Sequence, residues 1–267
     1  MGKVEELKYI SKKIRTDVIN MIYSAGSGHP GGSLSCVDIL VCLYHNIMNL
    51  NVDKDGKRID KFILSKGHAA PAYYATLASA GFIDRNDLNS LRKINSYLEG
   101  HPSNKINGVD VSSGSLGQGL SIANGMALAK KISNQEGYVY CLVGDGELEE
   151  GQIWEALMSA SKYMLSNVIL FVDNNRLQID GDIKDVKNVD KLKEKFESFG
   201  FYVQNIDGHN YNEIIDSVQN AKNSTLPNCI IASTIKGKGI SFMENQVSWH
   251  GKALNEDEYK TAISQLS

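Results

Sequence analysis

The sequence predicts an α/β protein in which helices cover both faces of a doubly wound, mostly parallel sheet, giving three layers. Two apolar runs of strand length, Tyr138–Val143 and Val168–Val172, have the composition of strands buried on both faces. The segment between them, Gly151–Leu165, carries apolar residues at helical spacing. Together the three segments predict a strand, helix, strand crossover with two parallel strands. The length of 267 residues suits one such domain, spanning 1–267.

The rest of the chain continues the alternation of helices and strands. Before the crossover, hydrophobic patterning predicts helices near 4–23, 37–44 and 69–80, with a strand at 61–64. A Gly-rich loop follows the first helix and extends through Ser35, and Asp84 is placed to cap a short helix around 88–91. After the crossover, helices near 189–198 and 211–222 alternate with strands at 201–206 and 229–233. The Gly- and Ser-rich stretch 99–119 is a long loop, and loops of that length in compact domains are usually functional.

Polar residues follow both strands of the crossover. Gly144-Asp145-Gly146 follows the first strand, and Asn174-Asn175 follows the second. Parallel strands end at the same edge of a sheet, where α/β folds bind ligands. A carboxylate and amide oxygens there suit Mg²⁺ and, through it, a diphosphate. Glycines allow close backbone approach, and the following helix directs N–H groups at the phosphates. The alternative is an ordinary strand end with a glycine turn, because Gly-Asp-Gly alone is common.

At this point the chain resembles the transketolase family. Gly-Asp-Gly followed at this spacing by Asn-Asn is the thiamine diphosphate signature of that family. The resemblance covers nearly the whole chain, and its motifs occur in the family's order: Ser27–Gly32, Leu64–Ala69, Gly100–Pro102, Gly114–Gly119, Gly144–Gly151 and Trp249–Gly251. The family often has Pro where this chain has Ser115, a departure expected to loosen the loop slightly.

The resemblance implies a cofactor, a metal and a set of site residues. The cofactor is thiamine diphosphate, held with Mg²⁺, for which Ca²⁺ or Mn²⁺ could substitute. The implied metal ligands are Asp145, Asn175 and the backbone carbonyl of Leu177. The implied cofactor-binding residues are His68, Gly114, Ser115, Leu116, Gly146, Glu150, Asn175 and His250. The implied catalytic residues are His29, His101 and His250, and these three and His68 each adjoin a glycine, which leaves an imidazole accessible in a loop.

The length implies that this chain carries only part of a transketolase. Single-chain transketolases are more than twice as long, with a second thiamine-binding domain and a C-terminal domain. The resemblance therefore implies the N-terminal subunit of a split enzyme, completed by a C-terminal subunit that carries the pyrimidine-binding domain and its glutamate. Two copies of each subunit, a heterotetramer, are expected. The implied reaction moves a two-carbon ketol unit between sugar phosphates.

Two other classes of thiamine diphosphate enzyme, and one non-enzymatic class, remain as alternatives. Deoxyxylulose-phosphate synthase and the E1 component of 2-oxoacid dehydrogenases contain related domains. The run from Gly28 through Gly119 is closer to transketolase. A catalytically silent assembly or regulatory protein could also retain the fold, although intact Asp145, Asn175 and the four histidines argue against it.

Composition indicates a cytoplasmic metabolic enzyme with small-molecule substrates. The net charge is −3, and no basic run indicates nucleic acid or an anionic membrane as a partner. The charged residues within 1–10 argue against a signal peptide or membrane span. The cysteines lack a metal-binding spacing and are expected to be reduced core thiols: Cys36, Cys42, Cys141 and Cys229.

Other polar residues receive structural interpretations. Glu147 and Glu149 are expected to be acidic residues of a helix's first turn. The resemblance to transketolase implies that Glu150 lies at a subunit contact. Lys236–Gly239 has no P-loop spacing and is interpreted as a solvated turn. His45 is interpreted as structural, and His209 is left open.

Overall fold

The structure, a computed structural model, describes residues 2–187 and 189–267; Met1 and Asn188, which belong to the predicted domain 1–267, lie outside the described residues. Its centre is a five-stranded sheet with the order β1-β2-β3-β5-β4, in which every neighbouring pair is parallel. The strands are β1 (Lys61–Leu64), β2 (Val139–Gly144), β3 (Val168–Asn174), β4 (Tyr202–Asp207) and β5 (Asn228–Ser233). All five lie within one or two residues of the predicted strands or coincide with them.

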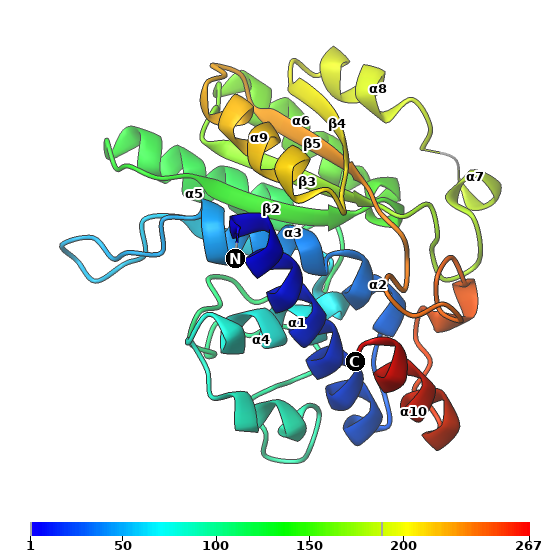
Figure 1. Cartoon of the computed structure of the whole chain (residues 1–267). Helices are drawn as coiled ribbons and strands as arrows, with labels where there is room; N and C mark the ends of the chain where they lie inside the picture. The colour runs from blue at the N-terminus through cyan, green and yellow to red at the C-terminus, as the bar shows by residue number, and fades with distance from the viewer. Residues whose placement is uncertain (1, 188) are drawn as a thin grey trace.

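Helices cover both faces of the sheet (Figure 1). One face packs against α1 (Lys3–Ala25), α3 (Val37–Cys42), α4 (Ala70–Ser79) and α9 (Tyr211–Lys222). The other packs against α5 (Gly119–Ile132), α6 (Gly151–Lys162) and α8 (Leu192–Ser198). In β2, Tyr140 and Leu142 enter the first core while Cys141 and Val143 enter the second. The side chains alternate between two buried faces, which explains the continuous apolar run and confirms the predicted fold class.

Within the described residues, four α-helices were not predicted. They are α2 (Pro30–Ser35), α5, α7 (Ile183–Val186) and α10 (Glu256–Gln265). The predicted loop through Ser35 is wrong because Pro30 begins a helix whose residues are all buried, and packing outweighs the low helix propensity of its glycines. Asn255 and Glu258 form a reciprocal capping box that begins α10, which lies beside α1.

The helix predicted at 37–44 is divided. After α3, residues Leu43–Ile47 form a π-helix, which includes His45. The Asp84 cap is confirmed, since its side chain accepts the N–H of Asn86 at the start of the 3₁₀ turn Arg85–Ser90. The stretch between that turn and α5 contains the predicted long loop, without a regular helix or strand.

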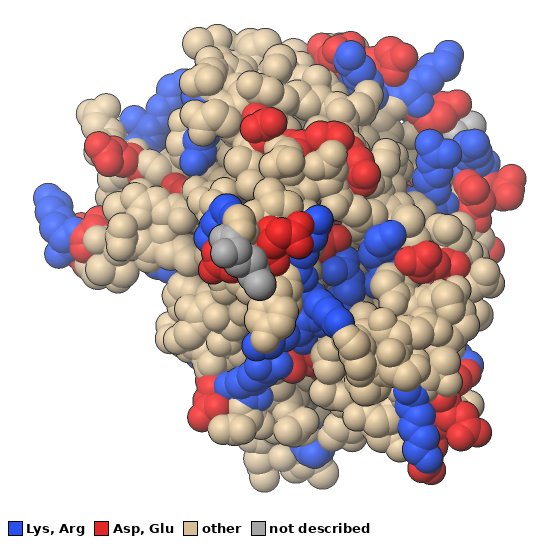
Figure 2. Space-filling model, viewed as in Figure 1, with Lys and Arg blue, Asp and Glu red and all other residues tan. Residues whose placement is uncertain are grey.

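The distribution of surface charge and the burial of the cysteines agree with what the composition predicts. Figure 2 shows acidic and basic side chains distributed over the same face, much of which is neither. No helix within 2–187 or 189–267 is both long and apolar enough to cross a bilayer. All four cysteines are buried and free, as predicted.

Candidate active site

A cavity of about 410 Å³ lies at the carboxyl edge of the sheet. The segments that follow β1, β2, β3 and β5 all contribute to its walls, as expected for the edge where parallel strands end. The loop 99–119 and the start of α2 complete it. The residues that line the cavity include His29, Lys66, His68, His101, Gly114, Leu116, Asp145, Gly146, Glu147, Glu150, Asn175, Leu177, Ile179, Lys236 and His250.

Oxygen atoms that could hold a hard cation converge on one side of the cavity. Asp145 is 3% exposed; its carboxylate accepts the N–H of Gly146 at 2.8 Å and a short hydrogen bond from the N–H of Arg176. The side-chain oxygen of Asn175 accepts the N–H of Leu177 at 3.1 Å, which folds the turn and leaves the Leu177 carbonyl at the cavity. Burial and the nearby Asp173 raise the pKa of Asp145 to about 7. A buried carboxylate beside another acid, with amide and carbonyl oxygens, fits Mg²⁺.

Two buried lysines face these oxygens. Lys66 follows β1 and forms a short ion pair with Asp173, while its ammonium also donates to the Gly32 carbonyl at 2.8 Å. Burial alone would lower the pKa of Lys66, but Asp173 outweighs it and the pKa is raised. Lys236 is 1% exposed and donates to the Leu177 carbonyl at 3.1 Å. Because Lys66 is paired with Asp173, Lys236, whose pKa burial lowers to about 8, is the cation more available to a diphosphate.

Three imidazoles surround one end of the cavity. The ring centroids of His29, His68 and His250 lie 5.3–5.6 Å apart, and Nδ1 of His250 is 2.9 Å from the Lys236 ammonium. Burial and then Arg92 lower the pKa of His29 to about 4, while burial and then Lys236 lower the pKa of His250 to about 3. These rings are therefore neutral near pH 7 and able to accept or relay protons. The buried Nδ1 of His29 has no hydrogen-bond partner among the described residues, so it is available to a ligand.

A close backbone approach shapes the floor of the cavity. A Cβ on Gly67 would lie 2.9 Å from the backbone nitrogen of Gly114, so there is no room for a side chain at position 67. Gly114 has φ of +155°, a conformation that favours glycine. The neighbouring Ser113 hydroxyl is buried, and no group in the described part of the chain bonds it. The close approach of these two segments positions Gly114, which lines the cavity.

Comparison with known proteins identifies the family. Residues 7–267 match the family described as transketolase, thiamine diphosphate binding domain. The chain belongs to the transketolase family. It is 38% identical to one subunit of an apulose-4-phosphate transketolase from Phocaeicola vulgatus, with 99% of this chain and 95% of that protein covered. It is 40% identical to a 6-deoxy-6-sulfo-D-fructose transketolase subunit from Clostridium sp., covering 98% of this chain and 96% of that protein.

Single-chain transketolases match over the same residues. Human transketolase is 41% identical across 99% of this chain, but the match spans only 42% of the human protein. The crystal structure of transketolase from Campylobacter jejuni superposes with a TM-score of 0.92 at 34% identity, covering 100% of this chain and 43% of that one. The chain thus spans less than half the length of single-chain transketolases.

The structure brings almost all of the transketolase residues named from sequence into one cavity. Ser115 is the exception: its side chain is exposed and does not line the cavity, although Gly114 and Leu116 on either side do. Asp145 and Asn175 meet at the same sheet edge, as the crossover predicted. Glu150 lines the rim and is exposed, a position compatible with a subunit contact.

Sequence reasoning missed both lysines. The interpretation of Lys236–Gly239 as a solvated turn is wrong for Lys236, whose side chain is enclosed by the Leu177 carbonyl and His250. Lys66 and Lys236 follow β1 and β5. The expectation that ligands bind where parallel strands end, which located Asp145, therefore also applied to these lysines. The Gly-rich composition around Lys236 obscured that signal.

Glu147 joins two parts of the transketolase site. Its carboxylate accepts N–H groups of Gly117 at 2.8 Å and Gly144 at 3.1 Å, and makes a short hydrogen bond with the Ser65 hydroxyl. The side chain is 3% exposed, so Glu147 is not only an acidic residue of a helix's first turn but also a buried acceptor that joins two loops. Glu149 fits that interpretation better, because it is half-buried and bonds only Gln178 at 2.9 Å in the described contacts.

We expect Glu147→Ala to destabilise the fold by roughly 3 kcal/mol, because it leaves buried N–H donors unpaired. That corresponds to a melting temperature lower by roughly 6–12 °C, measurable by calorimetry. Glu149→Ala is the matched control and should lower the melting temperature by less than about 3 °C. Equal losses in the two variants would contradict this assignment.

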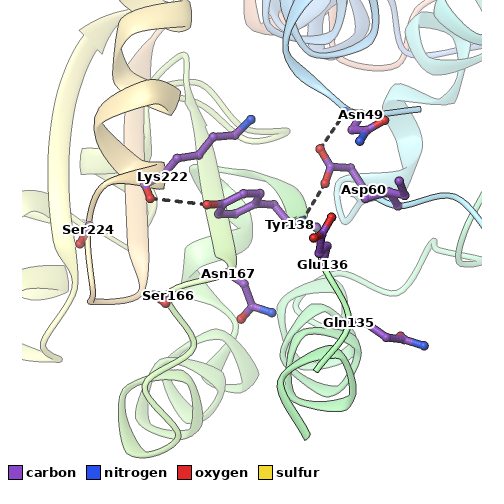
Figure 3. Close-up of a pocket in the computed structure, with 11 residues that line it drawn as sticks. Asn49, Asp60, Gln135, Glu136, Tyr138, Ser166, Asn167, Lys222 and Ser224 are labelled. Atoms are coloured by element: carbon purple, nitrogen blue, oxygen red, sulfur yellow. Dashed lines mark hydrogen bonds between the residues drawn. The ribbon is translucent and has the colours of Figure 1, made fainter. Parts of the chain in front are cut away.

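A second cavity, of about 490 Å³, lies at the opposite, amino end of the sheet (Figure 3). Its buried carboxylate, Asp60, accepts the N–H of Asn49 at 2.8 Å and that of Tyr138 at 2.7 Å. The Tyr138 hydroxyl donates to the Lys222 carbonyl at 3.5 Å. These groups bond one another, so their arrangement explains the folding of this end rather than ligand binding.

Proposed function

We propose that this chain is the N-terminal, diphosphate-binding subunit of a two-subunit transketolase. One observation carries the proposal: Asp145, Asn175 and the Leu177 carbonyl meet Lys66 and Lys236 at one sheet edge. The full-length match to two proteins named as transketolase subunits supports the division into subunits.

In this proposal, Asp145, Asn175 and the Leu177 carbonyl hold Mg²⁺, with Ca²⁺ or Mn²⁺ as substitutes. Lys66, Lys236 and His68 face the diphosphate, and Gly114, Leu116, Gly146 and Glu150 shape the cofactor pocket. When bound, thiamine diphosphate would supply a thiazolium carbon that adds to a ketose carbonyl and accepts the electrons of the broken carbon–carbon bond.

The histidines would handle protons and hydroxyl groups. His29, His101 and His250 line the cavity, and burial lowers the pKa of each below its ordinary value. Neutral imidazoles can accept a proton from a substrate hydroxyl and return it, which a permanently charged ring cannot do. We assign them to proton transfer and to binding of sugar hydroxyls.

The proposed partner is a C-terminal transketolase subunit that carries the pyrimidine-binding domain. Leu116 and Ile179 line the cavity and are 36% and 67% exposed, so apolar surface at the site remains for another chain to cover. Exposed Glu150 lies at the same rim. We propose a heterotetramer with two copies of each subunit, located in the cytoplasm, transferring a two-carbon unit from a ketose phosphate to an aldose phosphate.

Reconstitution tests this function. The chain alone should show no ketol transfer, and the complex with its C-terminal partner should turn over at about 1 s⁻¹ or faster with thiamine diphosphate and Mg²⁺. The measurement is aldose-dependent glycolaldehyde transfer, with omission of either cofactor as the control. Deoxyxylulose-phosphate formation or 2-oxoacid decarboxylation by the complex would favour the related enzymes instead. Cofactor binding without any turnover would favour the assembly or regulatory alternative.

A further inference from the structure

A buried polar cluster lies behind the loop that carries Lys236. Arg15 of α1 donates to both oxygens of Asp38 of α3, at 2.9 and 2.7 Å. Nδ1 of His209, which follows β4, lies 2.8 Å from the second of these oxygens, and the Tyr211 hydroxyl donates to the first at 2.6 Å. Asp38 is 3% exposed. Arg15 of α1 and the segment 209–211 thus converge on one carboxylate of α3.

The same cluster holds the backbone on both sides of Lys236. The N–H of Ile235 donates to Nε2 of His209 at 2.9 Å. The Nε of Arg15 donates to the carbonyl of Lys238 at 3.1 Å. Lys236 lies between these two attachments, with its ammonium between the Leu177 carbonyl and Nδ1 of His250. The loop is therefore attached to the cluster on both sides of Lys236, in addition to the hydrogen bonds of Lys236 and Gly237 with Asn245 and Gly31.

Histidine suits this position because it performs opposite roles with its two nitrogens. Accepting the N–H of Ile235 requires an unprotonated Nε2, so Nδ1 carries the proton and donates it to Asp38. Burial would raise the pKa of Asp38, but the Arg15 guanidinium together with the hydrogen bonds from His209 and Tyr211 outweighs it and holds that pKa well below its usual range. The ionised carboxylate then fixes the tautomer and the orientation of the ring, as acidic partners do for metal-binding histidines.

We propose that Arg15, Asp38 and His209 are positioning residues that set Lys236 in the active site. The assignment of Lys236 to the diphosphate rests on the proposed function. The placement of the ammonium by the cluster does not. The competing explanation is that the cluster only fastens α1, α3 and α9 together, in which case its loss would lower stability without moving Lys236.

Two substitutions of His209 separate these explanations. His209→Gln can retain an acceptor near the position of Nε2 for the Ile235 N–H, whereas His209→Asn retains only the shorter reach toward Asp38. The reporter is the imidazole of His250, observed by long-range ¹H–¹⁵N NMR of the full chain labelled with ¹⁵N-histidine. Lys236→Met supplies the reference for a His250 ring that has lost its lysine.

We expect the His250 signals of His209→Asn to move toward those of Lys236→Met, and those of His209→Gln to remain near wild type. Tyr211→Phe is the control, because it removes a hydrogen bond to the same carboxylate without touching 234–239. It should lower the melting temperature and leave the His250 signals in place. His250 signals that stay at wild type in His209→Asn, although Lys236→Met moves them, would overturn the proposal.

Cofactor affinity in the reconstituted complex provides a second readout. His209→Asn should weaken binding of thiamine diphosphate by roughly 10-fold, in the range known for residues that orient a ligand-binding group. In the Lys236→Met background the same substitution should have no further effect. Additive losses would mean that His209 acts independently of Lys236. A wild-type complex that binds no thiamine diphosphate would contradict the proposed function alone, and the NMR comparison would still decide the role of the cluster.

Discussion

Replacing Asp145 by Asn should eliminate metal-dependent binding of thiamine diphosphate and also raise the thermal stability of the metal-free chain. Residues that only orient a metal ligand typically contribute about 10–100-fold to affinity, so loss of a direct carboxylate ligand should cost more than about 100-fold. Calorimetric titration of the reconstituted complex with thiamine diphosphate, with and without Mg²⁺, measures this effect. Asp145→Asn with wild-type metal-dependent affinity would contradict the assigned site.

The gain in stability follows from the surroundings of Asp145. Burial and Asp173 raise its pKa from 3.8 to about 7, so the fold favours the neutral carboxyl, which Asn resembles in shape. Ionised Asp145 therefore destabilises the fold by the whole of this free energy above pH 7, and the destabilisation disappears as the pH falls toward 4. The shift corresponds to roughly 4 kcal/mol as an upper bound. The amide NH₂ forfeits one of the two backbone N–H bonds that the carboxylate accepts, at about 1–3 kcal/mol, so at pH 8 with a chelator the melting temperature should rise by a few degrees.

Asp60→Asn is the matched control for that experiment. Asp60 is also buried and, like Asp145, accepts two backbone N–H groups, but it lies at the amino end of the sheet, away from the active-site cavity. In both variants an amide NH₂ replaces one accepting oxygen, but only Asp145→Asn also removes a charge held beside Asp173, so Asp60→Asn should lose stability at pH 8 and keep its cofactor affinity. A rise in melting temperature in both variants would show that the gain is unrelated to the active site.

Local pattern was sufficient to predict the sheet and the meeting of Asp145 with Asn175. Both follow from two apolar strands joined by an amphipathic helix, since parallel strands bring their carboxyl ends together. Two unpredicted helices also had visible signals: Leu120, Ala123 and Ala127 lie at helical spacing in α5, and the capping box begins α10. These helices were missed although the pattern was present.

Other features depend on contacts between distant segments and could not be predicted from local sequence. Lys236 is buried because a carbonyl 59 residues away and His250 surround its ammonium, although its Gly-rich neighbours resemble a solvated turn. Glu147 is enclosed because Gly117 and Ser65 approach its carboxylate from two other loops. Local composition indicates that a lysine or glutamate prefers contact with water. Only the tertiary structure shows the hydrogen-bond partners that replace water when the side chain is buried.

Alanine substitutions of His29, His101 and His250 should lower turnover by about 10²–10⁴-fold while changing cofactor affinity much less, because these rings are assigned to proton transfer and to substrate hydroxyls. The contrast is Asp145→Asn, in which affinity is lost. Steady-state kinetics and calorimetry of the reconstituted complex measure both quantities in each variant. Equal losses of cofactor affinity in all four variants would contradict the division between metal ligand and proton carriers.

At His250, two conservative variants distinguish proton transfer from support of Lys236. In His250→Asn the side-chain oxygen can take the position of Nδ1, which lies 2.9 Å from the Lys236 ammonium. In His250→Gln the longer side chain places its oxygen near the position of Nε2 instead. Neither amide titrates, so both should remain slow in turnover if the imidazole carries a proton. His250→Asn should nevertheless retain cofactor affinity better than His250→Gln, because it preserves an acceptor for Lys236. Turnover restored to the wild-type rate by Asn would mean that His250 acts by holding the lysine, and that the proton is carried by His29 or His101.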